Sequence, residues 1–249
     1  MCTVADYVPF EVNGQVAVRK ESIIMLGSMV SPSTSHFDDV RRRYFATRSN
    51  IDSMHVYWSC PGTSRHQRAS LMERANQSMI LYGAQCWRLP RQGQQKLRAA
   101  QLYGWQRAMR MPRYWGEPKD SYFHRLNSAI AQLQQEMKVK KWDEVALSRL
   151  HSWAGHVVRL ADREPKRLVG RCLRWNGMLE LRTRSVAYGS QGHVGRFAVV
   201  RWESQFYDYY MGVLHKWWWD VAVDVVAWRD SYAGWLASRL ARMEADHEV

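Results

Sequence analysis

The spacing of apolar residues changes once along this chain, and that change limits the folds the chain can adopt. Near the N-terminus, apolar and polar residues roughly alternate around Asn13-Gly14. This pair tolerates the positive φ angles of a two-residue turn and predicts a β-hairpin, to which residues 22–26 could add a third strand. From about Ser35 onward, apolar residues recur every three to four positions, as in amphipathic helices. We therefore predict a mainly α fold: a short N-terminal β-hairpin, then a helical bundle and further C-terminal helices.

Five or more helices are expected after the hairpin. Ser35 stands three residues before Asp38, which is the spacing of a capping box at a helix start. A helix from about Gln94 to Met109 should end before Pro112, because proline cannot continue a helix. The other helices are predicted from apolar stripes that we expect to be buried. These stripes are Val40, Tyr44, Ile51 and Met54; Leu71, Ala75, Met79, Tyr82 and Cys86; Tyr122, Leu126, Ile130, Leu133 and Met137; Ala146, Leu150, Trp153 and Val157; and Trp217, Val221, Val225 and Trp228.

Positive charge is confined to the middle of the chain. Residues 1–60 contain six basic and six acidic residues, and residues 181–249 contain eight of each. Between residues 61 and 180 there are 22 basic and nine acidic residues, so this section carries the whole net charge of +13. A localised basic surface is typical of proteins that bind polyanions, and we expect contact with nucleic acid. The alternative is a surface whose charge serves only solubility.

Several classes of protein are disfavoured by composition. No apolar run approaches the 18 or more residues of a membrane span, and Met1 to Phe10 lacks the pattern of a signal peptide. Cys2, Cys60, Cys86 and Cys172 are too scattered for a zinc or redox motif, so structural thiols are expected. We therefore expect an intracellular protein, in the nucleus or the cytoplasm, with no membrane partner.

Phe37-Asp38-Asp39 superficially matches the aromatic-X-Asp-Asp turn with which reverse transcriptases hold catalytic metal ions. That motif sits on a hairpin between apolar strands, and its aromatic residue lies one position earlier, where this chain has His36. Here Val40 and a basic run follow in a helical pattern. Acidic residues in the first turn of a helix complement its dipole, so we interpret the pair as a helix start.

Other candidate ligands and stacking residues also favour structural roles. His151 and His156 are five residues apart, whereas zinc-binding pairs on one helical face are usually four apart. No convincing third ligand completes a set, and the same holds for His193. Trp142 and Trp175 lie beside basic clusters and could stack on bases, but core packing is the favoured interpretation for each. No metal site and no catalytic residue is predicted.

Four short segments carry distinctive combinations of residues. They are Phe10–Gly14 (FEVNG) leading to Met25-Leu26-Gly27, Ile80–Trp87 (ILYGAQCW), Arg149–Arg159 (RLHSWAGHVVR) and Ala222–Arg229 (AVDVVAWR). Together, and in this order, they resemble the region after the polymerase active site in LINE-type (non-LTR retrotransposon) reverse transcriptases. Met25 replaces the usual tyrosine of the family's Tyr-Leu-Gly motif, and Val225 replaces a basic residue of its last motif. The motif positions with expected structural roles are Leu26, Gly27, Leu81, Tyr82, Gly83, Trp87, Trp153, Gly155, His156 and Arg159.

The resemblance implies a C-terminal portion of such an enzyme. Residues 1–115 would hold the last edge of the polymerase palm and a thumb-like helical bundle. Residues 116–185 would form a basic helical region after the thumb, and residues 186–249 a set of tryptophan-rich helices. In this family the thumb follows the template–primer duplex through backbone contacts. The palm carboxylates that bind Mg²⁺ are absent, so the resemblance implies no cofactor for this chain and no polymerisation by the chain alone.

Two functions remain open at this point. The first is a nucleic-acid-binding fragment whose partners are RNA or an RNA–DNA duplex, together with a palm supplied elsewhere. The second is a helical scaffold or protein-interaction module with an incidental basic face. For the first function, Arg and Lys would neutralise phosphates without reading sequence. The residues predicted to do so are Arg98, Arg107, Lys138, Lys140, Lys141 and Arg167.

Overall fold

The computed structural model describes residues 11–12, 15–16, 23–25, 28–30, 36–163 and 204–245 of the 249-residue chain. Its N-terminal strands form two antiparallel pairs. β1 (Glu11–Val12) pairs antiparallel with β2 (Gln15–Val16), so the predicted N-terminal hairpin is present, whereas Asn13-Gly14 lies outside the described residues. β3 (Ile23–Met25) does not extend that pair and instead joins β4 (Ser28–Val30) in a second hairpin. Among the described residues the fold is otherwise helical, which confirms the predicted mainly α class.

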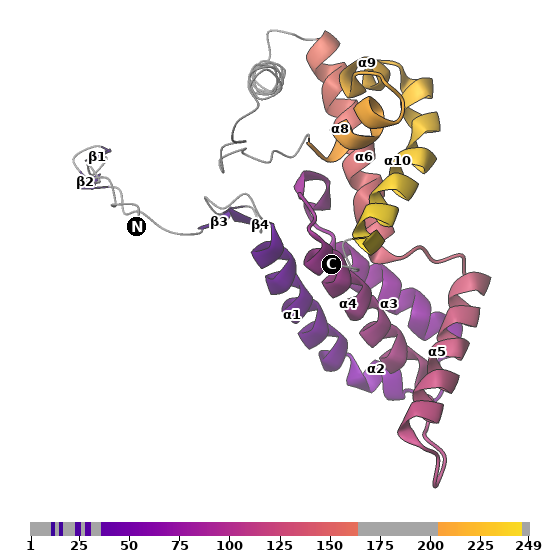
Figure 1. Cartoon of the computed structure of the whole chain (residues 1–249). Helices are drawn as coiled ribbons and strands as arrows, with labels where there is room; N and C mark the ends of the chain where they lie inside the picture. Colours follow the sequence, from indigo (N-terminus) through magenta and orange to yellow (C-terminus); the bar gives the residue numbers. More distant parts are fainter. Residues whose placement is uncertain are drawn as a thin grey trace, which may run out of the picture.

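A three-helix bundle follows the strands and contains α1 (Phe37–Ser53), α3 (Arg65–Ile80) and α4 (Arg91–Met109). α1 and α4 run in the same direction side by side, and α3 returns antiparallel to both (Figure 1). The short α2 (His55–Ser59) follows α1, and the 3₁₀ helix η1 (Ala84–Cys86) follows α3. α5 (Lys119–Glu136) folds back along α4 after a long connection that forms the lower end of the molecule in Figure 1.

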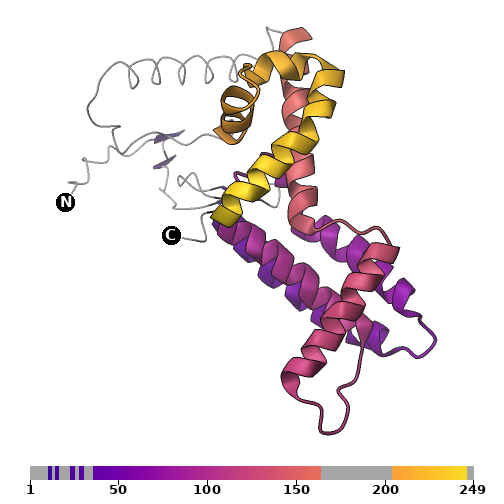
Figure 2. The ribbon, with the colours of Figure 1, turned by 45° about the vertical axis from the view of Figure 1, so that its right-hand side comes forward.

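The long helix α6 (Trp142–Arg163) connects this bundle to the C-terminal helices. These are α8 (Ser204–Gly212), α9 (Trp218–Val223) and α10 (Val225–Ala245), which gather around the far part of α6 (Figure 2). One hydrophobic cluster lies between α1, α3, α4 and α5 and includes Trp142 and Ala146 of α6. A second cluster begins with Leu147 of α6 and continues into the C-terminal helices. The proposed domain limits at residues 115 and 185 stay predictions. No described helix is both long enough and apolar enough to cross a bilayer.

The structure confirms the predicted buried face of α5 and the predicted end of α4. In α5 the buried side chains are Leu126, Ile130 and Leu133, with Tyr122 and Met137 partly buried against the same cluster. α4 ends at Met109, three residues before Pro112, as expected. α3 begins after Ser64, whose hydroxyl accepts from the amide of Gln67 in a capping box.

Other sequence predictions were wrong in detail. The N-cap residue of α1 is His36, which makes no side-chain cap bond, and not Ser35 as expected; Ser35 lies outside the described residues. The predicted stripe of α3 is displaced: Tyr82 and Cys86 are exposed, and the buried face includes Met72 and Ile80. The reason is that polar residues occupy this face as well, and these are Arg68, Glu73 and Asn76. In the C-terminal stripe, a break at Asp224 separates α9 from α10 and leaves Val225 exposed.

Candidate nucleic-acid interface

The structure separates the predicted basic residues into two groups. Lys138, Lys140 and Lys141 are exposed together on the turn that joins α5 to α6, and Lys138 has a positive φ of 52° there. Arg98 of α4 is directed toward the same region, because its Nε lies 2.7 Å from Oδ2 of Asp143 at the start of α6. Asp143 is fully buried, so its ion pair with Arg98 connects α4 to the start of α6. Arg98 is therefore a structural residue as well as a surface cation.

Arg107 lies on the opposite side of α4 from Arg98. The two residues are nine positions apart. At about 100° per residue, this separation corresponds to about two and a half helical turns, so the two side chains leave the helix in opposite directions. Arg107 instead faces α1, where its guanidinium lies 3.5 Å from Asp52. The predicted set is therefore not one surface. Arg167, Leu26 and Gly27 lie outside the described residues.

Basic and aromatic side chains alternate along the seam between α1 and α4. The guanidinium of Arg48 lies 4.2 Å from the ring centre of Tyr103 and 5.7 Å from that of Tyr44. Nζ of Lys96 lies 4.9 Å from the Tyr44 ring centre, and Arg107 lies 5.1 Å from that of Tyr103. Each is a cation–π contact. We call this surface the cation–aromatic ladder; its members are Tyr44, Arg48, Lys96, Tyr103 and Arg107.

Hydrogen bonds hold the ladder in place. Arg48 Nη1 donates to the hydroxyl of Tyr44 at 3.1 Å, and Arg107 Nη2 donates to that of Tyr103 at 2.9 Å. The Tyr103 hydroxyl in turn donates to Oδ1 of Asp52 at 2.5 Å. Hydrogen bonds to the Tyr44 and Tyr103 hydroxyls raise the pKa of Arg48, so its charge is permanent. The side chain of Arg107 is 55% exposed, which leaves donors free to meet a ligand.

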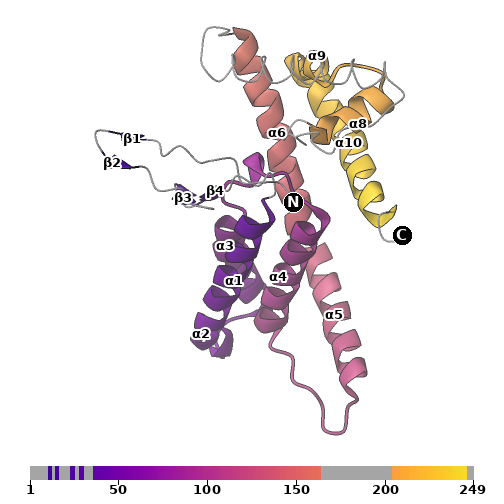
Figure 3. The ribbon, with the colours of Figure 1, turned by 60° about the vertical axis from the view of Figure 1, so that its left-hand side comes forward.

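The ladder continues at both ends. At the start of α1, the guanidinium of Arg41 lies 5.9 Å from the ring centre of Phe45, which is 54% exposed. At the other end, Arg107 and Asp52 line an open cavity of about 650 Å³. Its wall also includes Trp58 and Arg110. Cations and aromatic rings therefore extend along the seam from the start of α1 to the end of α4. Figure 3 shows the ribbons of α1 and α4 side by side.

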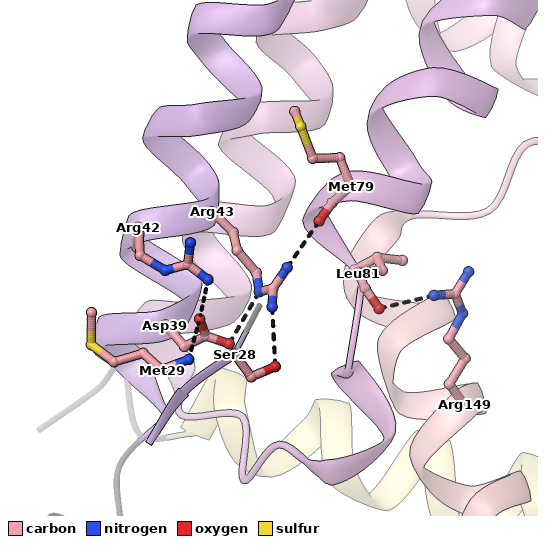
Figure 4. Close-up of polar contacts among 8 residues, drawn as sticks. All are labelled: Ser28, Met29, Asp39, Arg42, Arg43, Met79, Leu81 and Arg149. Carbon is pink, nitrogen blue, oxygen red and sulfur yellow. Dashed lines mark hydrogen bonds and ion pairs between the residues drawn. The ribbon is translucent and has the colours of Figure 1, made fainter. Parts of the chain in front are cut away.

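A buried ion pair fixes the start of α1 against the strands and α3 (Figure 4). Asp39 accepts from the amide of Met29 at 3.0 Å, from Arg42 at 2.9 Å and from Arg43 at 3.0 Å. Burial raises the pKa of Asp39, but these hydrogen bonds outweigh it and hold the pKa below its ordinary value. Arg43 also donates to the carbonyl of Met79 and to the hydroxyl of Ser28. Asp38 and Asp39 thus occupy the first turn of a helix, as predicted.

The family-like segments contact one another. Leu81 is fully buried, and its carbonyl accepts from Arg149 Nη1 at 2.9 Å, which joins the second segment to the third. Arg159 at the end of the third segment donates to the carbonyl of Ala222 in the fourth at 2.9 Å. The side chain of Trp87 is buried as well. Leu81, Trp87 and Arg159 therefore have structural contacts, and the roles that the resemblance implies for the motif positions stay predictions.

The motif glycines act in different ways. We expected Gly83 and Gly155 to permit close approach of helices. Gly155 does so, because a Cβ there would lie 2.4 Å from Nε1 of Trp228. Gly83 lies outside a helix and has φ of 75°. Glycine is favoured at this turn because other residues rarely adopt this left-handed backbone conformation, and not because two helices approach closely there. Tyr82 beside it is 52% exposed and lies under Arg43.

Neither histidine of the third segment is placed as a metal ligand. His156 is exposed and stacks on Trp153, with ring centres 5.5 Å apart. His151 is buried, stacks on Trp228 at 4.0 Å, and lies 2.9 Å from the Tyr210 hydroxyl. Within the described ranges, no three His, Cys, Asp or Glu side chains gather as a group that could hold a metal ion.

Trp142 is a core residue. It is fully buried, and its Nε1 donates to Oε2 of Glu73 at 2.6 Å, so it cannot stack on a base. The thiols of Cys60 and Cys86 are free and exposed, contrary to the structural role expected for them.

No family model, curated protein or solved structure matched this chain.

The ladder was only partly visible in the sequence. Of its members, Arg107 was predicted as a phosphate contact and Tyr44 as part of an apolar stripe. The missed signal is a spacing: Tyr44 precedes Arg48, and Tyr103 precedes Arg107, each by four residues. Residues four apart share one face of a helix, so both pairs indicate a mixed aromatic and basic face. That the two faces adjoin follows only from the packing of α1 on α4.

Proposed function

We propose that this chain binds RNA or an RNA–DNA duplex through phosphate contacts along the cation–aromatic ladder. The observation that carries the proposal is the ladder's composition. It presents three cations, Arg48, Lys96 and Arg107, against the single carboxylate of Asp52. Tyr44 and Tyr103 fix the directions of these cations, so little side-chain freedom is lost when a ligand binds.

The length of the ladder suits a polymer of phosphates. Lys96 and Arg107 are eleven residues apart on one straight helix, so they are separated by ~16 Å along its axis at about 1.5 Å per residue. Duplex nucleic acid presents one phosphate charge per ~1.7 Å of its axis, so a stretch of this length carries about nine. Cations on the side of a helix neutralise such charges without reading bases. The exposed lysines 138, 140 and 141 would add a second, separate phosphate contact.

The resemblance to LINE-type reverse transcriptases supports this proposal from a second direction. In that family the helical thumb follows the template–primer duplex, and here the ladder lies on the bundle that would correspond to the thumb. The chain would then act with a polymerase palm supplied elsewhere. It would not synthesise DNA alone, because Asp39 is held by Arg42 and Arg43 inside a helix start rather than on a hairpin.

The proposal is tested by fluorescence anisotropy with a labelled RNA–DNA hybrid over a range of salt concentrations. With on the order of five phosphate contacts, the log–log slope of affinity against salt should be roughly −4 to −5. Hybrids of different sequence should bind about equally well. Absence of binding at low salt, or an affinity that does not change with salt, would exclude this function and favour a protein scaffold.

A further inference from the structure

The connection between α4 and α5 carries a fully exposed tryptophan, Trp115. Burying an indole ring contributes a few kcal/mol in most folds, so complete exposure of the largest side chain is unusual. One exposed apolar residue is common on protein surfaces and by itself indicates nothing. Here the surrounding loop supplies a second observation, because it holds this residue in one fixed position.

Trp115 occupies the apex of a tight turn from Tyr114 to Glu117. The amide of Glu117 donates to the carbonyl of Tyr114 at 3.1 Å, and Gly116 has φ of 73°. A type II turn requires positive φ at its third residue, here Gly116, and Trp115 is the second residue of this turn. Pro112 and Pro118 restrict the backbone on both sides of the turn.

Arg125 of α5 stabilises this turn through hydrogen bonds and an ion pair. It donates to both carboxylate oxygens of Glu117, at 3.0 and 2.8 Å, and to the carbonyl of Pro112 at 3.0 Å. Its guanidinium also covers the ring of Tyr114, 4.0 Å from the ring centre. A bidentate arginine–carboxylate pair is the most directional kind of ion pair in proteins. The backbone of this loop is therefore preorganised, and the indole of Trp115 at its tip makes no packing contact within the described fold.

The charge around the tip favours nucleic acid as the partner. Glu117 is paired with Arg125, and three exposed cations around the turn, Arg110, Arg113 and Lys119, outnumber the exposed carboxylate of Asp120. Beside Trp115, Tyr114 is 61% exposed, and Arg125 lies over one face of its ring, so a cation forms part of this aromatic surface. The aromatic anchor of a protein–protein contact is usually set in an apolar patch instead. Cations around an aromatic ring are the arrangement with which proteins hold unpaired nucleic acid, where the ring stacks on a base.

The tip also lies at the end of the ladder. Arg107 belongs to the ladder, and it lines the open cavity together with Arg110, Met111 and Pro112, which lead into the loop. A duplex bound along α1 and α4 would therefore run toward this loop, which is the lower end of the molecule in Figure 1. The region where the duplex stops would meet Trp115.

We propose that Trp115 stacks on an unpaired base where a bound duplex ends or opens into a single strand. This inference rests on the proposed function, since the ladder must first hold the duplex. It adds a structural preference that the ladder alone does not provide: a junction between duplex and single strand should bind more tightly than a blunt duplex.

The test compares two labelled RNA–DNA hybrids by fluorescence anisotropy. One is blunt, and the other has the same duplex with a short RNA overhang. The full chain should bind the overhang hybrid more tightly. Stacking on one base is worth about 1–3 kcal/mol, so Trp115→Ala should reduce that preference by roughly 5- to 150-fold. Trp115→Phe should keep most of the preference, and binding of the blunt hybrid should stay unchanged in both variants.

A matched control is Trp153→Ala, which removes another exposed indole, on α6. It should leave the preference unchanged. Equal binding of both hybrids by the unaltered chain would overturn the role of Trp115 and leave the proposed function intact. Equal weakening of both hybrids by Trp115→Ala would also overturn base stacking. Failure of the unaltered chain to bind either hybrid would reject the proposed function itself.

Discussion

The indole of Trp228 packs directly on Gly155, in the space that any larger side chain would occupy. Nε1 of Trp228 donates to the carbonyl of His151 at 3.0 Å, so the ring cannot move away without breaking that bond. Since a Cβ on Gly155 would lie 2.4 Å from the same Nε1, the two helices α6 and α10 can approach only through glycine. This contact joins the third and fourth family-like segments.

We predict that Gly155→Ala destabilises the protein. The added methyl group would force Trp228 out of its stack, and overpacking of this kind costs about 1–3 kcal/mol. The measurement is urea unfolding followed by circular dichroism. Gly212→Ala is the matched control, because a Cβ at Gly212 would have no atom within 4 Å. Equal stability of the two variants would contradict the close approach.

A second prediction concerns pH. Burial of His151 lowers its pKa to about 3, whereas an unfolded histidine titrates at 6.5. The sign follows from this difference: between pH 6.5 and 3 the unfolded chain binds a proton that the folded chain does not. Stability is therefore complete above pH 6.5 and falls below it by about 1.4 kcal/mol per pH unit.

Between pH 7.5 and 5, His151 should thus cost the protein about 2 kcal/mol of unfolding free energy. His151→Gln keeps a hydrogen-bonding group near the Tyr210 hydroxyl but cannot titrate. Urea unfolding at the two pH values should show a smaller loss in this variant than in the unaltered chain. The same loss in both would mean that His151 does not carry the pH dependence.

Glu73 supports a third prediction. Its carboxylate is buried and accepts from the indoles of Trp105 and Trp142, both at 2.6 Å, and from Gln101 at 2.9 Å. Glu73→Leu would leave the two buried indole donors without an acceptor, at about 1–3 kcal/mol each, while Gln101 would keep only its bond to the carbonyl of Lys140. We expect a loss of several kcal/mol or no folded protein, measured by thermal unfolding. Arg74→Leu, at the exposed neighbouring position, should change stability little.

The buried face of a helix could be predicted from the sequence where that face contains only apolar residues. α5 buries Leu126, Ile130 and Leu133 on a clean apolar stripe, so periodicity alone located its core face. α3 buries Glu73, whose partners lie 28 to 69 residues away in the chain, and no local pattern marks such a residue as internal. The stripe assigned to α3 was wrong for that reason.

The candidate interface shows the same limit. Charge counting located the basic region, but it could not distinguish Arg98, which is paired with the buried Asp143, from Arg107, which is paired with the half-exposed Asp52 on the ladder. That distinction depends on how α4 is rotated between its neighbours, and the rotation is set by packing. Trp115 was missed because exposure of an aromatic side chain leaves no trace in hydrophobic periodicity.

The last prediction separates the two basic surfaces. In one variant, Arg48, Lys96 and Arg107 of the ladder are changed to Ala. In the other, Lys138, Lys140 and Lys141 are changed to Ala. Each variant removes three positive charges, so the net charge of the chain is the same in both, and a difference between them reports on location alone. The ladder cations are held by Tyr44 and Tyr103, whereas Lys138 and Lys140 have no such aromatic contact among the described residues.

If the ladder holds the duplex, its variant should lose more affinity for an RNA–DNA hybrid, about equally for every sequence. Each lost phosphate contact lowers the salt slope by about 0.9, so the ladder variant should approach a slope roughly 2 to 3 units shallower. The lysine variant should change the slope less, in proportion to the contacts that it makes. Anisotropy titrations at several salt concentrations measure both slopes. Equal losses in the two variants would mean that binding follows net charge alone, and the ordered arrangement of cations on Tyr44 and Tyr103 would then have no role in recognition.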